Sequence, residues 1–524
     1  MNRRDRRDRG VGLVAMDEQS PLTEAERPAK IGHTAWVLLI ILPFVIFTRL
    51  WGLGQKPFHH DESLFASYAY HLRVTGDYDF NEILHGPFLE DVSALIFAIF
   101  GDSEVTARLW PAVAGSLLVL LVWRLRDLLG NLAALLGVVF LTASPTLMYY
   151  SRFNRNDVPF TFAAMLFVYC VARFFQRGRM WQWLLALMAV GWMICIEETY
   201  VIFLFTVATY AVALGLVEAA AGTPSSRRAA WARLSSSQPG FARKFALTTV
   251  LGLLAALLMI VTLYTTFFKH LEHADGPIEA IIYWAGQHRE QRIFGEFHYY
   301  VPILLIYEFL FVAIFIWGVG RTLRRAAWLR GWIGWAWATW SVVLLAALWK
   351  HRIPDGLAAI LHMQRGWHLW LAIEIFVLGA ATCAVLVTER RLLDGFFVWW
   401  TVIAFLAYSY AGEKVPWIAV HVVFPMIVTA AIFVQEIARS AAISEVPRGR
   451  LLTRAALRGF ARTPALAFFV VALPATTAIA LRLSFVNDAN PAERHVYTHT
   501  TDDYKAMIEE VVDIASASGQ PPIS

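Results

Sequence analysis

Acidic and basic side chains gather in a few short segments between long apolar stretches of this sequence. The first segment, HHDE at 59–62, places two imidazoles beside two carboxylates directly after an apolar stretch. A carboxylate suits general-base chemistry, because it can take the proton of an attacking hydroxyl group. Asp61 and Glu62 would equally fit the first turn of a helix, where the helix dipole favours acids. Both interpretations of the pair stay open.

A metal site is the other chemistry that this segment offers. Imidazole and carboxylate ligands suit zinc or manganese, and His59, His60 and His85 are the weak candidates. Adjacent histidines seldom converge on one ion, and the sequence has no HExxH spacing. We therefore predict no firm metal site and no cofactor, with a divalent metal ion as the minor alternative.

The segment YSRFNRND at 150–157 contributes Arg152, Arg155 and Asp157 where an apolar stretch ends. Arginine is the side chain best suited to two-pronged binding of phosphate or carboxylate. The alternative is that these long side chains only extend to the membrane boundary. A role in phosphate binding is favoured. The apolar stretches predict membrane spans, as described below, and basic residues are scarce on the side of the membrane where this segment would lie.

Two later segments complete the polar set. The turn YAGEKVPW holds Glu413 and Lys414, which could also be an ordinary surface ion pair. The segment 268–300 holds His288 and Arg292, four residues apart and so able to share one face of a helix. Its aromatic residues are typical of a belt at the membrane boundary.

The composition identifies the class of protein that must position these residues. Of the 524 residues, 58% are hydrophobic and 16% charged, against about 45–50% and 25% in soluble domains. The mean hydropathy is +0.52. These values exclude a soluble nucleic-acid-binding protein despite the net charge of +5, and three cysteines inside apolar stretches exclude a disulfide framework.

The apolar stretches predict an all-α integral membrane protein, a bundle of about 13 transmembrane helices. About 20 apolar residues are needed to cross a membrane as a helix, and the alternating pattern of a β-barrel is absent. The predicted spans are 34–50, 105–123, 131–149, 158–172, 181–197, 199–218, 245–267, 301–319, 331–349, 368–388, 394–410, 417–437 and 463–483.

The distribution of Lys and Arg predicts the orientation of these spans. With a cytoplasmic N-terminus, the basic tail at 1–33 and the basic segment at 439–462 both fall on the cytoplasmic side. The apolar segment at 87–100 would reverse every later loop if it crossed the membrane. It has only 14 residues, about 21 Å as a helix, so we predict that it lies at the outer interface.

The predicted organisation has three parts, a cytoplasmic tail at 1–33, a transmembrane domain at 34–483 and a short extracytoplasmic tail at 484–524. The first outer loop, 51–104, is predicted to hold two juxtamembrane helices. Helical spacing relates the apolar residues of the first of these helices, Leu64, Phe65, Tyr68, Ala69 and Leu72. In the tail the same pattern relates Tyr504, Met507, Ile508, Val511 and Val512.

Taken together, these motifs resemble those of a known protein family. The chain is similar to the prokaryotic flippase-activity-associated Agl-type proteins of the GT-C superfamily of polyprenyl-phosphate-sugar glycosyltransferases. That superfamily also includes the protein O-mannosyltransferases and the lipid A aminoarabinose transferases. The matching segments are HHDES at 59–63, HGPF at 85–88, FGDSEVTARLWPAVAG at 100–115, SPTLMYYSRFNRND at 144–157 and YSYAGEKVPW at 408–417 with His421.

The resemblance implies roles for the polar residues. Asp61 would be the catalytic base and Glu62 its neighbour in the acidic motif. The donor phosphate and sugar would be bound by Arg152, Arg155, Asp157, Lys414, His288 and Arg292. Supporting roles would fall to His60, His85, Glu198 and Glu413. Where the family leads us to expect a lysine, this chain has Glu197, so a metal ion or Lys414 would have to replace its contact with phosphate.

We therefore predict an inverting membrane glycosyltransferase that moves a sugar from a polyprenyl-phosphate donor to an extracytoplasmic protein, glycan or lipid. It would lie in the cytoplasmic membrane of a prokaryote, with its active site on the outer face and no nucleic-acid partner. The alternatives are a non-catalytic partner or transporter of lipid-linked sugars and an oligosaccharyltransferase-like enzyme with a pyrophosphate donor. A transporter would place its essential polar residues near the middle of the membrane.

Overall fold

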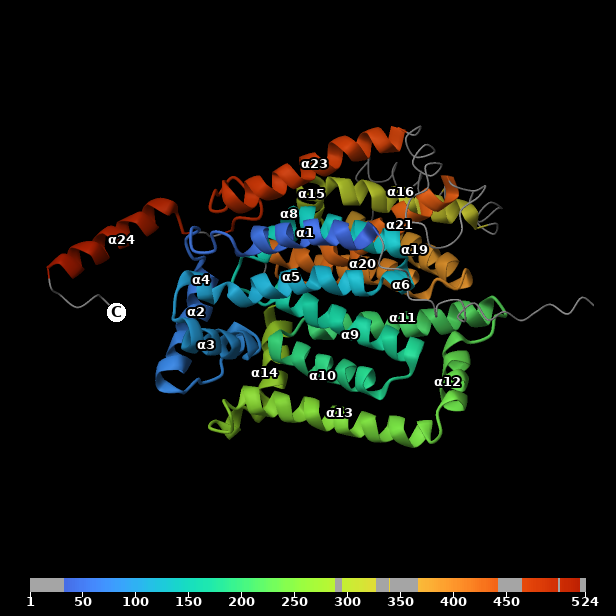
Figure 1. Cartoon of the computed structure of the whole chain (residues 1–524), viewed down its shortest axis with the longest axis horizontal. Coiled ribbons are helices and arrows are strands. Elements are labelled where there is room, and N and C mark those ends of the chain that lie inside the picture. The colour runs from blue at the N-terminus through green and yellow to red at the C-terminus, as the bar shows by residue number, and fades with distance from the viewer. Residues whose placement is uncertain are drawn as a thin grey trace, which may run out of the picture.

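The computed structural model describes residues 33–287, 295–326, 339, 366–441, 464–497 and 500–518. Every regular element in these ranges is a helix, which confirms the predicted all-α class. Most of the long helices run side by side along the long axis of the molecule (Figure 1). At one end of this bundle lie α2 (His60–Thr75), α3 (Phe88–Phe100) and α4 (Glu104–Ala107), and at the other end α12 (Ser226–Ser237) crosses it.

The remaining helices follow the apolar stretches of the sequence. They are α1 (His33–Leu50), α5 (Leu109–Arg124), α6 (Arg126–Leu129), α7 (Asn131–Ala143), α8 (Pro145–Tyr150), α9 (Asp157–Arg177), α10 (Met180–Ile196), α11 (Tyr200–Ala220), α13 (Phe241–Tyr264), α14 (Gly276–Gln287), α15 (Tyr300–Tyr307), α16 (Phe309–Arg325), α19 (Gly366–Thr388), α20 (Leu392–Tyr410), α21 (Ala419–Ala441), α23 (Pro464–Phe485) and α24 (Asp502–Ala517). Short 3-10 turns stand at Glu82–Leu84, Leu271–Asp275 and Pro416–Ile418.

Eight helices in the described ranges are long and apolar enough to cross a membrane, so the chain is a multi-pass membrane protein. Helices α15 and α16 meet at an angle of 103°, and the number of such spans is nine if this bent pair is counted as one span. Shorter apolar helices stand at Leu39–Leu50, Asn131–Ala143 and Met180–Ile196, where three further spans are predicted. The predicted span at 331–349 lies outside the described residues, so the count of thirteen stays a prediction.

Burial distinguishes the centre of the bundle from its lipid-facing edge. Helix α21 packs against α7, α16 and α20, and 94% of its span is buried inside the protein, against 11% for α13. Helix α13 contacts α10 along one side and leaves a row of leucines exposed on the other, Leu247, Leu251, Leu254 and Leu258. Exposed apolar surface on a spanning helix is stable in contact with lipid.

The first long loop folds into the two predicted helices, α2 and α3. Helix α2 has Asp61 and Glu62 in its first turn, as predicted, and ends at Gly76, whose φ of 67° suits glycine. Its apolar residues Phe65, Ala69 and Leu72 are buried, and α2 packs on α3. Most of the predicted apolar stripe therefore packs against protein, with Leu64 and Tyr68 partly buried.

The C-terminal tail forms α24, with the predicted apolar stripe on an exposed face. Tyr504 and Met507 in this stripe are about half exposed. Lys505 connects the helix to the end of the bundle that holds α4, since its Nζ donates to the carbonyl of Gly54 at 2.6 Å and to Glu104 at 2.5 Å. In Figure 1, α24 projects from this end of the molecule.

Candidate active site

The two acids of the HHDE segment lie in opposite surroundings. Glu62 is fully buried and receives two hydrogen bonds from the Arg108 guanidinium, at 2.7 and 2.8 Å. Backbone N–H groups of His59 and Asn154 donate to the same carboxylate. Burial alone would raise the pKa of Glu62, but Arg108 and Lys56 outweigh it and hold that pKa well below its ordinary value. With both oxygens occupied, Glu62 is placed to anchor the loop rather than to take a proton.

Asp61, by contrast, keeps 28% of its side chain exposed. Its carboxylate pairs with the Arg155 guanidinium, which also lies over the Trp417 ring, 4.2 Å from the ring centre. His59 forms the N-cap of α2, because its Nδ1 accepts the N–H of Asp61 at 3.0 Å and Glu62 completes the capping box. The cap and Arg155 together fix the direction of a partly exposed carboxylate.

His85 connects the first loop to the end of α10. Its Nδ1 lies 2.8 Å from the Glu198 carboxylate, and its Nε2 lies 3.5 Å from Arg155. The next residue, Gly86, donates its N–H to the Ile196 carbonyl, and a Cβ at Gly86 would stand 2.2 Å from the Cys195 carbonyl oxygen. Only glycine permits this approach, which brings His85 to Glu198.

The His85–Glu198 pair predicts a pH-dependent stability. Burial disfavours the charged imidazole, but the Glu198 carboxylate and its hydrogen bond outweigh burial and raise the pKa of His85 from 6.5 to about 9. The pair then contributes its full stability below about pH 6.5 and loses it as the pH rises through 9. We expect the Tm of the wild type to fall more steeply between pH 7 and 10 than that of His85→Gln, in thermal unfolding of detergent-purified protein. Parallel Tm profiles of the two proteins would contradict this assignment.

A second polar cluster adjoins Arg155. The Arg155 Nε lies 3.7 Å from Asp157 Oδ2, and Asp157 is the first residue of α9. His421 Nε2, on α21, lies 3.3 Å from Asp157 Oδ1 and 3.3 Å from Glu197 Oε1. All three side chains are buried, and their ligand atoms lie within 4.8 Å of one another.

The structure therefore brings together five of the predicted site residues, Asp61, His85, Arg155, Asp157 and Glu198. Sequence reasoning missed Arg108 and the pairing of Glu197 with His421. The signal for Arg108 was present, since an arginine at the start of an apolar span needs a partner.

Other predicted site residues lie elsewhere. Arg152 donates to the carbonyls of Trp51 and Gly52, just after α1 ends, at 2.5 and 3.1 Å. Lys414 is buried, with its Nζ at 3.2 Å from the Tyr408 carbonyl and bonded to that of Ala411. Lysine in this position satisfies the last carbonyls of a helix, here those of α20.

His60 is exposed, and Glu413 is partly exposed beside Lys414. His288 and Arg292 lie outside the described residues. The three weak metal candidates do not converge, because His59 caps α2 and His85 pairs with Glu198.

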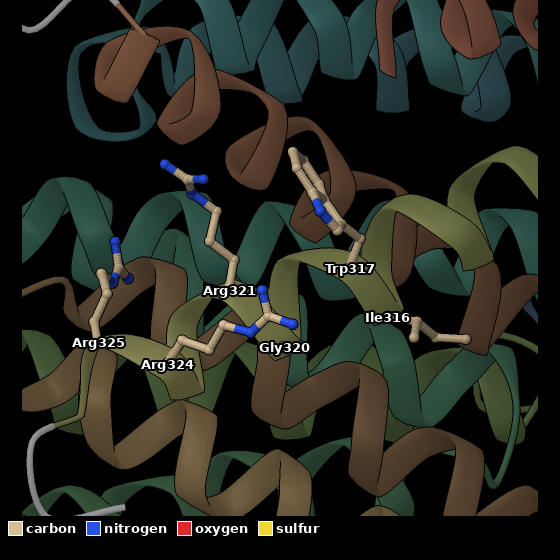
Figure 2. A pocket seen from close by; sticks show the side chains of 6 residues that line it. All are labelled: Ile316, Trp317, Gly320, Arg321, Arg324 and Arg325. Atoms are coloured by element: carbon tan, nitrogen blue, oxygen red, sulfur yellow. The ribbon is translucent and has the colours of Figure 1, made fainter. Parts of the chain in front are cut away.

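A groove of about 520 Å³ lies far from these residues, at the end of α16 (Figure 2). Its lining residues are Ile316, Trp317, Gly320, Arg321, Arg324 and Arg325. The arginines lie near the C-terminal end of α16. The groove shares no residue with the candidate site.

Comparison with known proteins gives one family match. Residues 84–222 match the family model of the dolichyl-phosphate-mannose-protein mannosyltransferases. This segment includes His85, Arg155, Asp157 and Glu198 but not Asp61. The match supports a membrane glycosyltransferase of the GT-C superfamily. No curated protein matches the chain.

Among solved structures, two of ArnT from Cupriavidus metallidurans are similar. The structure bound to undecaprenyl phosphate is 18% identical over 85% of this chain and 89% of that one, with a TM-score of 0.37. The apo structure is 17% identical over 86% and 91%, with a TM-score of 0.38.

Proposed function

We propose that this protein is a GT-C glycosyltransferase that moves a sugar from a polyprenyl-phosphate donor to an acceptor hydroxyl outside the cytoplasm. The observation that carries the proposal is the contrast within the acidic pair. Glu62 is sequestered by Arg108, whereas Asp61 is partly exposed and braced by Arg155. The pair thus leaves one carboxylate available for chemistry, at a site lined by cations.

In the proposed reaction, Asp61 takes the proton of the acceptor hydroxyl as its oxygen attacks the anomeric carbon. The new glycosidic C–O bond forms while the bond from that carbon to the phosphate oxygen breaks, so polyprenyl phosphate leaves with the electron pair. A single displacement of this kind inverts the anomeric configuration. Arg155, which pairs with Asp61, and protonated His85 beside it would stabilise the leaving phosphate.

We also propose that the chain is an Agl-type protein, because its sequence motifs resemble those of that family. The matched family is named for a lipid-phosphate mannose donor and a protein acceptor, so mannose and a protein are the first donor sugar and acceptor to test. The outer-face orientation and the division at residues 33 and 483 are part of the same proposal.

The alternative is a non-catalytic partner or a transporter of lipid-linked sugars. Against a transporter, the charged residues of the site stand at helix ends, with Asp61 in the first turn of α2 and Asp157 first in α9. A transporter places its substrate site near the middle of its spans.

The test is release of polyprenyl phosphate by protein purified in lipid nanodiscs. We would supply a panel of polyprenyl-phosphate sugars with host membrane extract as the source of acceptor, and empty nanodiscs as the control. Release from one donor, coupled to transfer of its sugar, would establish the transferase. Donor binding without release from any member of the panel would favour the non-catalytic alternative.

Lys414 supplies a separate prediction about the donor. The Lys414 Nζ contacts the carbonyls of Tyr408 and Ala411, whereas the resemblance assigns Lys414 to the donor phosphate. On that assignment we expect Lys414→Ala to raise the apparent donor KM about tenfold with little change in kcat, because a cation that binds the phosphate equally in ground and transition states affects KM alone. Lys414→Arg, which keeps the charge, is the matched control. If Lys414 only satisfies the carbonyls of α20, Lys414→Ala would lower the Tm and leave the donor KM unchanged.

A further inference from the structure

Three buried side chains from distant parts of the chain meet beside the proposed site. Asp157 begins α9, Glu197 directly follows α10, and His421 lies in α21. Each is at most 4% exposed. The imidazole Nε2 stands 3.3 Å from one oxygen of each carboxylate. One imidazole and two carboxylates can therefore present a ligand atom each to a common point.

The hydrogen bonds within the cluster leave part of it unsatisfied. Among the described residues, Asp157 Oδ2 is buried and has no hydrogen-bond partner, and the Arg155 Nε is 3.7 Å away from it. Within the same ranges, the buried Oε1 of the adjacent Glu198 also lacks one. A buried carboxylate oxygen without a donor is costly, more so beside further carboxylates. A cation is the ligand that would remove this cost.

We propose that Asp157, Glu197 and His421 bind a divalent cation, zinc or manganese. Two carboxylates and one imidazole are ligands that both ions accept, and a site with three protein ligands keeps further positions open to water or to a phosphate oxygen. The open positions distinguish this site from a closed structural one.

The surroundings hold the three ligands in place. The Thr199 hydroxyl donates to Glu197 Oε1 at 2.5 Å. The Tyr408 ring stacks on the His421 ring, with 5.0 Å between their centres, and the Phe160 ring meets the same His421 ring edge-on, with 5.4 Å between their centres. Contacts of this kind orient metal ligands and raise affinity for the ion.

If the proposed function holds, the ion would add positive charge where phosphate departs. Asp157 contacts Arg155, and Arg155 contacts Asp61, so a single side chain separates the site from the proposed base. The binding proposal itself rests only on the cluster and is tested without activity.

A second group in the described residues provides an internal control. Glu296, His298 and His368 also place their ligand atoms within 4.8 Å of one another. This group has two imidazoles and one carboxylate, whereas the proposed site has one imidazole and two carboxylates. The two sites can therefore be told apart by the ligands of the bound ion as well as by mutation.

The experiment uses full-length protein in nanodiscs, depleted of metal and then dialysed against zinc or manganese. We expect one ion per chain, with affinity reduced about tenfold or more in His421→Asn and in Glu197→Gln and unchanged in His298→Asn. Thermal unfolding without metal checks that each variant is folded. X-ray absorption of the zinc-loaded wild type should show one imidazole ligand.

No ion in the wild type, or equal affinity in His421→Asn, would overturn the proposal. Loss of the ion in His298→Asn together with two imidazole ligands would instead place it at the second group, which also overturns it. Because binding is read directly, a bound ion in a protein without transferase activity would reject the proposed function and leave the metal site standing.

Discussion

Asp61→Asn is expected to lower kcat for sugar transfer by about 10²- to 10⁴-fold, the range that a positioned general base contributes. The amide has nearly the shape of the carboxylate but cannot accept the proton of the acceptor hydroxyl. The N-cap survives the change, because His59 accepts from the backbone N–H of residue 61. Donor binding and Tm should therefore stay close to those of the wild type, and release of polyprenyl phosphate from the labelled donor measures the effect.

Asp77→Asn is the matched control for this prediction. Asp77 lies in the same long loop, is exposed and pairs with His270 away from the site. Its variant should transfer sugar at close to the wild-type rate. If Asp61→Asn retained half or more of the wild-type kcat, Asp61 would not be the base.

Arg108→Met is expected to lower the free energy of unfolding by about 3–5 kcal/mol, the usual cost of removing one partner of a buried ion pair. Glu62 would remain buried without its guanidinium, and the carbonyls of Leu53 and Lys56 would lose donors at 2.6 and 2.8 Å. The double variant Arg108→Met/Glu62→Gln should recover part of the loss, because it no longer buries an unpaired charge. Thermal unfolding in detergent measures both variants.

The comparison for this second prediction is Arg73→Met. Arg73 pairs with Asp102 at 2.9 Å, but both side chains are substantially exposed, and exposed pairs contribute only about 0–1 kcal/mol. Equal shifts of Tm in Arg108→Met and Arg73→Met would show that the buried pair does not anchor the loop.

The sequence predicted well what depends on local pattern. Apolar length located the spanning helices, and spacing located α2 with Asp61 and Glu62 in its first turn. The motif residues Asp61, His85 and Arg155 do meet in the structure. Helical periodicity and helix-terminal preferences act over a few residues, so a single sequence contains them.

The sequence could not predict contacts that depend on how distant helices pack. His421 meets Asp157, 264 residues earlier in the chain, and no local spacing relates the two. Arg152 and Arg155 stand three residues apart, yet one reaches the end of α1 and the other reaches Asp61. The direction of each side chain is fixed by tertiary contacts of the turn between α8 and α9. For the same reason the local pattern alone could not show that Arg108 buries Glu62 and leaves Asp61 partly exposed.

The buried pair between Glu62 and Arg108 also bears on how the chain enters the membrane during synthesis. The apolar helix α3 stands between these two residues in the sequence. Had α3 been threaded through the bilayer, the carboxylate and the guanidinium would end on opposite sides of it, each isolated from the other. Their contact at 2.7 Å can form only in chains whose α3 stayed on one side. A chain inserted with α3 across the membrane would therefore lack the ion pair that fixes its first loop. Only the topology with α3 on one side is stabilised by this pair.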